Sequence, residues 1–223
     1  MWFMTKDKDI REPLFDFLEE EYGKTRIIEE KNIGDSRADV IMVTEKALYG
    51  IEIKSDADTY ARLAGQIKDY DQYFDGNIVV IGSSHAHGIE ERVPDYWGII
   101  TVEIVEGACD FYILRKPLKN PKMKYDKKLS ILWRPEIAAL QELNEMPKYA
   151  QLSKKNVIAK ICERIPQKIS EECVDAQICD LLFERDYEKI AEILNEYRIA
   201  HGGKAKKARV KRRRKRRTKK IVG

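Results

Sequence analysis

The sequence lacks long apolar runs, and it lacks the residue patterns that hold zinc. No stretch reaches the roughly 18 consecutive apolar residues that a membrane-spanning helix needs, and the N-terminus MWFMTKDKDIREPL does not have the pattern of a signal peptide. The four cysteines include no C-x-x-C pair, and only His201 lies near them in sequence. These absences predict a cytoplasmic protein with buried free thiols and no membrane partner.

Motifs of several well-known chemistries are absent as well. The chain has no Gly-rich phosphate loop, no G-x-S-x-G motif and no Ser/His/Asp arrangement. Its hydrophobic share of 43% is enough for a core, and its charged share of 36% predicts a heavily ionised surface. A length of 223 residues allows one ordinary domain and a smaller one.

The net charge of +4 conceals a strong difference between the body of the chain and its C-terminal tail. The segment KAKKARVKRRRKRRTKK, residues 204–220, holds 13 of the 42 basic residues and no acidic one, which leaves 29 basic against 38 acidic residues in the body. Such a run repels itself and cannot bury a core, so we expect it to be disordered on its own. It favours nucleic acid as a partner, through contacts to phosphates. A tail that docks on the acidic body, or is only solvated, is the alternative.

The first half of the chain predicts a mixed α/β sheet flanked by helices. Apolar stripes predict an opening helix over 9–23 and a second helix over 59–74. Short spacing and β-branched residues predict an antiparallel meander of three strands between them. The expected strands, in chain order, are 25–33, 37–43, 47–55, 77–82, 98–105 and 110–116. The order α-β-β-β-α-β is typical of a mixed sheet with helices on its faces.

After Pro117 the pattern changes from strands to helices. Residues 120–130 are basic and turn-like, and helical patterns follow over 134–146, 153–165 and 171–200. The first part of this region resembles the SAP motif, a small DNA-binding module, and a helical pair that only supports the sheet is the alternative. We therefore predict a first domain over 1–117, a helical domain over 118–203 and a basic tail over 204–223.

Three charged side chains are predicted to meet on two neighbouring strands. Glu52 and Lys54 stand two residues apart and share one face of a strand, while Ile51 and Ile53 face the core. Hairpin pairing would bring Asp39 of the preceding strand within their reach. Two converging carboxylates are costly unless a cation lies between them, and such hard oxygen ligands suit Mg²⁺ or Mn²⁺. Ordinary cross-strand ion pairs on a half-exposed hairpin are the alternative.

The helix that follows these strands favours a reaction site. Gln66 and Tyr70 are spaced i, i+4, and Arg62 lies one turn earlier, so the three share a stripe that can face the carboxylates and a DNA backbone. In such a site Lys54 would polarise a water molecule or stabilise charge on a phosphate under attack.

These residues resemble a known family. Asp39, Glu52-Ile53-Lys54 and the segment QIKDY are similar to the D…(D/E)-x-K…Q-x-x-x-Y pattern of the PD-(D/E)XK phosphodiesterase superfamily, which has the restriction-endonuclease-like fold. The order helix, three-strand meander, helix, strand also resembles that fold. More narrowly, RADVIM, GIEIKSDADTYARL, QIKDYDQYFD and PDYWGI resemble an uncharacterised bacterial and phage branch of the superfamily.

The resemblance implies a divalent-metal-dependent phosphodiesterase, a nuclease that acts on DNA. Asp39 and Glu52 would bind Mg²⁺ or Mn²⁺ together with the backbone carbonyl of Ile53. Lys54 would position the hydrolytic water, and the implied catalytic set is completed by Gln66 and Tyr70.

Relatives in the superfamily often carry a further acidic residue, and we expect Glu30 in that role, with Glu12 and Glu19 as weaker candidates. Many relatives also have a proline before the first aspartate, where this chain has Arg37-Ala38. Nucleic-acid contacts are expected from Arg37, from Arg62 and from the tail. The tail residues concerned are Lys211, Arg212, Arg213, Arg214, Lys215, Arg216 and Arg217.

Other polar residues near these segments have simpler interpretations. Asp58 is expected to cap the second helix, and the role of Asp56 is open. His85 and His87 are expected to be ordinary loop residues, because ligation would need further converging ligands.

Two hypotheses follow from the sequence. The first is a cytoplasmic Mg²⁺-dependent nuclease of restriction-endonuclease-like fold, with DNA as its partner and RNA as the alternative substrate. The second is a DNA-binding or adaptor protein that keeps the fold without cleaving. Endonuclease or exonuclease action and a homodimer are left open.

Overall fold

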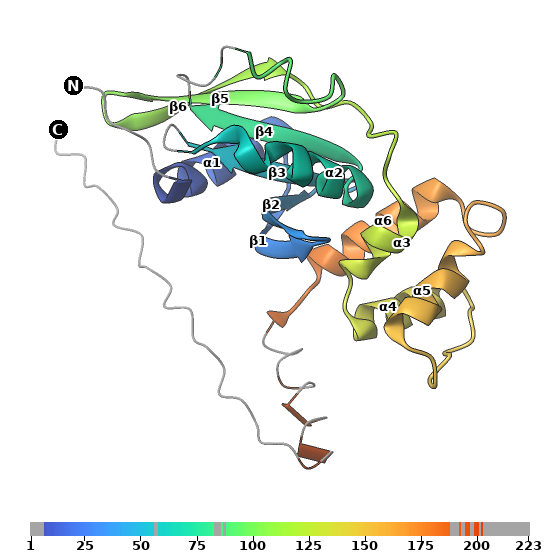
Figure 1. Ribbon diagram of the computed structural model, residues 1–223. Helices are drawn as coiled ribbons and strands as arrows, with labels where there is room; N and C mark the ends of the chain where they lie inside the picture. Colours follow the sequence, from blue (N-terminus) through green and yellow to red (C-terminus); the bar gives the residue numbers. More distant parts are fainter. Residues whose placement is uncertain are drawn as a thin grey trace. The chain divides into compact units, whose positions relative to one another are not determined.

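Six strands form one mixed sheet among the residues that the structure describes. The structure, a computed structural model, describes residues 7–187 except 56–57, 83–85 and 87, and isolated positions between 192 and 202. The order of the strands in the sheet follows the chain (Figure 1). In that order they are β1 (Arg26–Ile33), β2 (Ser36–Val43), β3 (Leu48–Lys54), β4 (Gly76–Gly82), β5 (Gly98–Val105) and β6 (Ala108–Arg115). The predicted mixed α/β class is confirmed at this level.

The strands pair in two modes. β1, β2 and β3 are antiparallel neighbours, which confirms the predicted meander. β4 pairs with β3 and β5 pairs with β4 in the parallel direction, and β6 returns antiparallel to β5. A parallel neighbour requires a crossover, and the helix between β3 and β4 supplies it. β4 is buried along its whole length, as its continuous apolar run indicates.

Helices precede, interrupt and follow the sheet. None of the described helices is long and apolar enough to cross a membrane. In chain order they are α1 (Asp7–Tyr22), the 3₁₀ helix η1 (Tyr60–Arg62), α2 (Leu63–Tyr73), α3 (Tyr125–Ser130), α4 (Arg134–Leu143), α5 (Lys154–Cys162) and α6 (Glu171–Phe183).

The two faces of the sheet carry different layers (Figure 1). Ile51 and Ile53 of β3 pack with Ile10 and Leu14 of α1. The alternate positions of β3 face α2, as expected for side chains that alternate along a strand. The core on the α2 face continues into α3–α6. Glu52 and Lys54 therefore lie on the face that α2 covers.

Three predicted element boundaries were wrong. Residues 120–130 were expected to be turn-like, but Tyr125–Ser130 forms α3. The helix expected over 171–200 is interrupted after Phe183 by three successive charged residues, and the positions that the structure describes between 187 and 200 are again helical. The second helix begins later than expected, because Thr59 is extended and η1 precedes α2.

The predicted capping role of Asp58 was also wrong. Its carboxylate accepts hydrogen bonds from the Ser55 backbone N–H at 2.9 Å and from the Ser55 hydroxyl at 2.6 Å. The 3₁₀ helix begins after Thr59 without a side-chain cap. Asp58 therefore stabilises the exit of the chain from β3.

The sheet and the described helices up to Phe183 belong to one compact unit, Met1–Phe183. The change of character that the sequence has at Pro117 marks the passage from strands to helices within that unit. Asn120, which follows Pro117 in the chain, connects the two parts of the unit. Its side-chain amide donates to the backbone carbonyls of Asp71 and Phe74 at 2.8 and 2.7 Å.

A buried carboxylate of α2 bonds to the segment that leads into β5. Asp71 accepts hydrogen bonds from the Tyr96 hydroxyl at 2.7 Å, from the Trp97 indole at 2.9 Å and from the Lys122 ammonium at 3.3 Å. Trp97 is fully buried. Because a buried carboxylate needs such partners, this cluster holds α2 in one position over the strands.

The cysteines are free, as predicted, but they are not all buried. Cys179 is buried in α6, Cys109 and Cys162 are half-buried, and Cys173 is exposed. The expectation of buried thiols was therefore wrong for Cys173, which lies on the outer side of α6.

Candidate active site

The site forms where β2 leaves the pairing of the sheet. The β2–β3 pairs extend only to Val40 and Ile51, one residue before Asp39 would meet Glu52. On the other side of β2, the β1–β2 pairing skips Glu30 and Asp39, which are not paired with each other. Glu30 has a φ of +54°, in the left-handed region that non-glycine residues rarely adopt. Asp39 is thus freed from regular pairing on both sides.

Side chains from two helices replace the missing strand partners of Asp39. Its backbone N–H donates to the Tyr70 hydroxyl of α2 at 3.1 Å. Its backbone carbonyl accepts a hydrogen bond from Arg11 of α1 at 3.2 Å. Buried backbone groups need partners, so these two bonds allow the strand to open at this point.

The carboxylate of Asp39 is held by one backbone group and one cation. Oδ2 accepts the backbone N–H of Ile53 at 3.0 Å, and Oδ1 lies 3.6 Å from a guanidinium nitrogen of Arg11. The N–H and C=O of one residue in a strand point to the same side. The carbonyl of Ile53 is therefore directed toward the same edge as Asp39.

The carboxylate of Glu52 is almost completely buried, with 1% of its side chain exposed. Oε1 accepts from the Lys54 ammonium at 2.6 Å and from the Gln66 amide at 2.5 Å, and Oε2 accepts from the Tyr70 hydroxyl at 2.7 Å. Lys54 also donates to the amide oxygen of Gln66 at 2.9 Å. Glu52, Lys54 and Gln66 therefore form a closed ring of hydrogen bonds, braced by Tyr70.

Tyr70 serves as a fixed donor and acceptor in this network. Burial, and then the negative charges of Glu52 and Asp39, raise the pKa of its hydroxyl well above the ordinary value. It therefore stays protonated. Gly50 makes room for it, because a Cβ atom there would lie 2.6 Å from the Tyr70 ring and 2.2 Å from the Phe74 ring.

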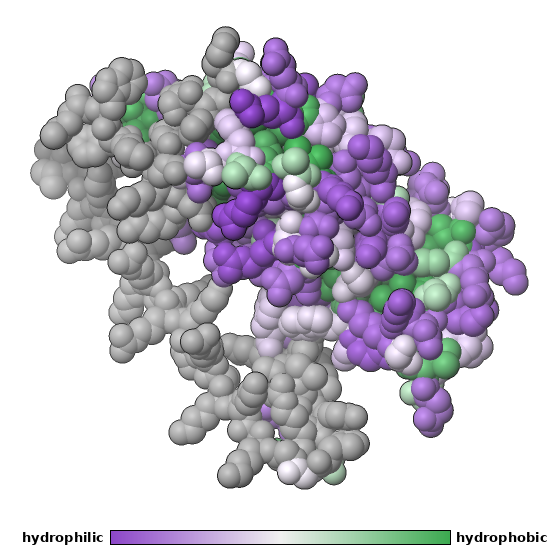
Figure 2. Space-filling model, in the orientation of Figure 1, coloured by the Kyte–Doolittle hydropathy of each residue, from purple (hydrophilic) through white to green (hydrophobic). Residues whose placement is uncertain are grey.

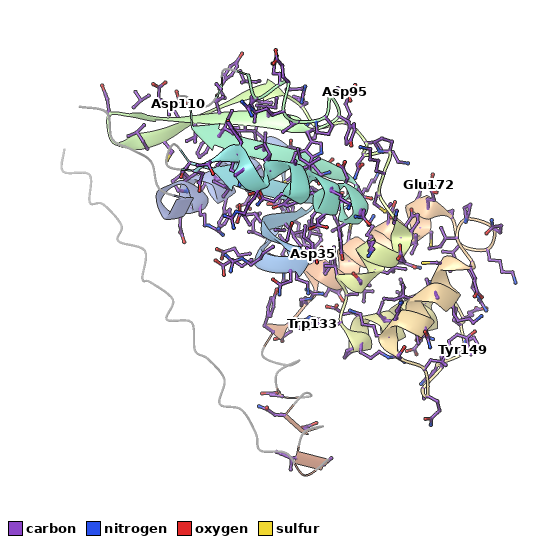
Figure 3. The ribbon with its side chains drawn as sticks, in the orientation of Figure 1. Asp35, Asp95, Asp110, Trp133, Tyr149 and Glu172 are labelled. Carbon is purple, nitrogen blue, oxygen red and sulfur yellow. The ribbon has the colours of Figure 1, made fainter. Side chains whose placement is uncertain are left out.

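The site opens into a polar cleft with a volume of about 1260 Å³. Figure 2 shows mainly hydrophilic residues on this face of the molecule. One wall is the β1–β2 turn, where Asp35 is labelled in Figure 3. The cleft is also lined by cationic side chains, namely Arg37, Arg62, Lys68 and Lys127. Its charges can therefore meet a polar or anionic molecule.

The structure brings together most of the side chains that the sequence singled out. Asp39, Glu52, Lys54 and Gln66 line the cleft, and Tyr70 lies directly beneath them. Ile53, Arg37 and Arg62 line it as well.

Glu30 does not join the site. Its carboxylate, 55% exposed, lies 3.8 Å from the guanidinium of Arg37 and is not part of the cleft lining. Glu30 departs from regular strand geometry because its φ is positive. The candidates behind it, Glu12 and Glu19, are exposed on α1. None of these three carboxylates is part of the cleft lining.

Several predicted residues lie outside the described part of the chain. They are Asp56, His85, His87 and the tail residues Lys211, Arg212, Arg213, Arg214, Lys215, Arg216 and Arg217.

Sequence reasoning missed Arg11. Its guanidinium bridges Asp39 and the carboxylate of Glu29, with Nη1 of Arg11 3.5 Å from Oε2 of Glu29. The available signal was that Arg11 is a basic residue next to the buried Ile10, in a helix whose other charged residues are acidic except for Lys8. That signal does not name the partner, which comes from a distant strand.

The donor set has the chemistry of a small divalent-cation site. Among the described residues no group of three or more His, Cys, Asp and Glu side chains is placed to hold a metal. The pair Asp39 and Glu52, with the carbonyl of Ile53 between them in sequence, supplies hard oxygen atoms. A carboxylate has about four acceptor positions, and Glu52 uses three of them on Lys54, Gln66 and Tyr70. The residues therefore fit Mg²⁺ or Mn²⁺.

Fold and site together define a mixed α/β protein with two carboxylates and a lysine on the sheet face that α2 covers, and with a glutamine on α2 itself. The chain belongs to the family of the bacteriophage P4 protein cII, whose family model matches residues 4–208. No curated protein matches it. A solved structure to which it is similar is the SPO1766 protein of unknown function from Silicibacter pomeroyi, at 18% identity and a TM-score of 0.39, covering 57% of this chain and 81% of that one.

Proposed function

We propose that the protein is a divalent-metal-dependent nuclease of the PD-(D/E)XK superfamily that hydrolyses phosphodiester bonds of DNA. One observation carries the proposal: Asp39, Glu52 and Lys54, from two neighbouring strands, converge at a polar cleft. Two carboxylates beside the path of a polyanion are unfavourable unless positive charges offset them, because like charges repel.

The fold gives additional support. The helix α1, the antiparallel meander β1–β3, the crossover helix α2 and the parallel strand β4 follow the order expected for a restriction-endonuclease-like domain. The two carboxylates come from the second and third strands of the meander, and the Gln and Tyr of the pattern come from the crossover helix.

Asp39, Glu52 and the carbonyl of Ile53 would hold the metal ion, and a bound ion would supply Lewis-acid stabilisation of the charge that develops on phosphate. The chain's own groups keep this donor set in place. Tyr70 connects Asp39 to Glu52, because its hydroxyl accepts from one residue and donates to the other. Ile53 orients Asp39 through its backbone N–H.

In the proposed reaction Lys54 would act on the attacking water. An ammonium group has three donors, and Lys54 uses two of them on Glu52 and Gln66 among the described residues. The third can hold a water next to the carboxylates, and the positive charge can stabilise the phosphate under attack. Gln66 fixes the ammonium group because it also bonds to Glu52.

A non-catalytic DNA-binding or adaptor protein is the second candidate, and one observation favours it. Each carboxylate oxygen of Asp39 and Glu52 already has a protein partner, either a hydrogen bond or an ion pair with Arg11. Such a site can keep its shape without a metal ion.

The first test is cleavage of linear, circular, branched and single-stranded DNA, and of RNA, in EDTA, Mg²⁺ and Mn²⁺. We expect cleavage only with a metal ion. It should be lost in Asp39→Asn and kept in Asp35→Asn, a matched change in the same cleft. Binding without cleavage on every substrate would favour the adaptor, and cleavage that survives Asp39→Asn would show that the site is wrongly assigned.

The basic tail is proposed to raise affinity for nucleic acid. Each neutralised phosphate releases counterions, so log affinity should fall steeply with log salt in the full chain. Deletion after Gly203 should flatten that slope, as measured by fluorescence anisotropy with a labelled duplex. An unchanged slope would mean that the tail does not contact phosphates.

A further inference from the structure

We propose that Arg11 is an internal counter-ion of the metal site, which competes with the divalent ion for Asp39 and so sets the affinity for metal. The inference rests on the proposed function, because it assumes that Asp39 is a metal ligand. It assigns a role to a residue on α1, a helix outside the D…(D/E)-x-K…Q-x-x-x-Y pattern.

The position of Arg11 is specific. Its side chain is 12% exposed, and its guanidinium reaches Asp39 twice, at the backbone carbonyl and at Oδ1. α1 lies on the face of the sheet opposite α2, so Arg11 approaches Asp39 from one side and Tyr70 approaches it from the other. The positive charge thus lies beside the carboxylate that would hold the metal ion.

Removal of Arg11 should leave Asp39 in place. Oδ2 of Asp39 is bonded to the backbone N–H of Ile53, and the backbone N–H of Asp39 is bonded to Tyr70. Neither bond involves Arg11. Arg11→Gln removes the charge beside the Asp39 carboxylate and also the hydrogen bond from Arg11 to the backbone carbonyl of Asp39.

The charges around the site nearly cancel before a metal binds. Asp39 and Glu52 are negative, whereas Lys54 lies 2.6 Å from Glu52 and Arg11 lies 3.6 Å from Asp39. A divalent ion must enter against both cations. Without Arg11 the site keeps an uncompensated carboxylate, so a cation is bound more tightly.

Glu29 provides a change of opposite sign. Its carboxylate, 40% exposed, shares the guanidinium of Arg11 with Asp39. Replacing Glu29 by glutamine removes a negative charge that shares the guanidinium of Arg11 with Asp39. The affinity for metal should then fall.

The test is a titration of the full chain with Mn²⁺ in the absence of nucleic acid, with free Mn²⁺ followed by electron paramagnetic resonance. Arg11→Gln should bind Mn²⁺ about three to ten times more tightly than the wild type, the size expected for removing one nearby charge from a partly hydrated site. Glu29→Gln should bind more weakly. Arg11→Lys, which keeps the charge, should stay within about twofold of the wild type.

Asp39→Asn separates the two ideas. If it binds Mn²⁺ as the wild type does, the proposed metal site is wrong. If it weakens binding while Arg11→Gln and Glu29→Gln do not shift affinity in opposite directions, only the role of Arg11 is overturned. Circular dichroism checks that each variant is folded. If Arg11→Gln does not fold, Glu29→Gln decides the test alone. Weaker binding of Mn²⁺ by Glu29→Gln then supports the inference, and unchanged or tighter binding overturns it.

Discussion

Replacing Lys54 by methionine is expected to lower the rate of metal-dependent cleavage by about 10²- to 10⁴-fold, the range that a positioned proton-transfer or charge-stabilising group supplies. The same change should lower the free energy of unfolding by about 3–5 kcal/mol, because it leaves the carboxylate of Glu52 without its cation in a buried position. The two side chains of this ion pair are 6% and 1% exposed.

The double variant Glu52→Gln/Lys54→Met separates stability from catalysis. It removes both charges together, and replacing a buried ion pair by neutral side chains of similar size is often close to neutral for stability. We therefore expect urea denaturation to show most of the lost stability restored, while cleavage stays absent. Recovery of cleavage in the double variant would mean that the pair has only a structural role.

Much of the site could be predicted from sequence because its residues follow short-range rules. Glu52 and Lys54 share a face through strand alternation, and Gln66 and Tyr70 share a face through helical spacing. Both rules act within a few residues of the chain. The structure accordingly bonds Gln66 and Tyr70 to the same carboxylate.

What the sequence could not supply depends on contacts between distant segments or on single unusual dihedral angles. Arg11 meets Asp39 across 28 residues, and no local pattern encodes that pair. Glu30 departs from the site because of its positive φ, which alternation does not foresee. α3 was missed because its lysines suggested a solvated turn, whereas Lys128 is in fact fully buried.

Lys128 joins the helical region to the sheet. Its ammonium group lies 2.7 Å from the carboxylate of Asp75 and 2.5 Å from that of Asp175 in α6, and none of its side chain is exposed. Asp75 in turn accepts the backbone N–H of Leu48 at the start of β3 at 2.7 Å. One cation thus connects α3, α6 and the strand that carries Glu52 and Lys54.

Lys128→Met should therefore be among the most destabilising single changes in the chain, at about 3–5 kcal/mol, because it leaves two carboxylates without a cation. Urea denaturation measures the loss, and Lys124→Met, at an exposed position just before α3, should stay within about 0.5 kcal/mol of the wild type. A loss below about 1 kcal/mol would contradict the role assigned to Lys128.

The stability lost in Lys128→Met is expected to depend on pH. Burial raises the pKa of Asp175 above its ordinary value, whereas Lys128 acts in the opposite direction. Without Lys128 the folded protein should bind protons at this carboxylate more readily than the unfolded chain does. A raised pKa in the folded state favours folding at low pH and disfavours it above that pKa. The stability gap between Lys128→Met and the wild type should thus be widest near neutral pH and narrow as the pH falls toward the ordinary aspartate pKa of about 4.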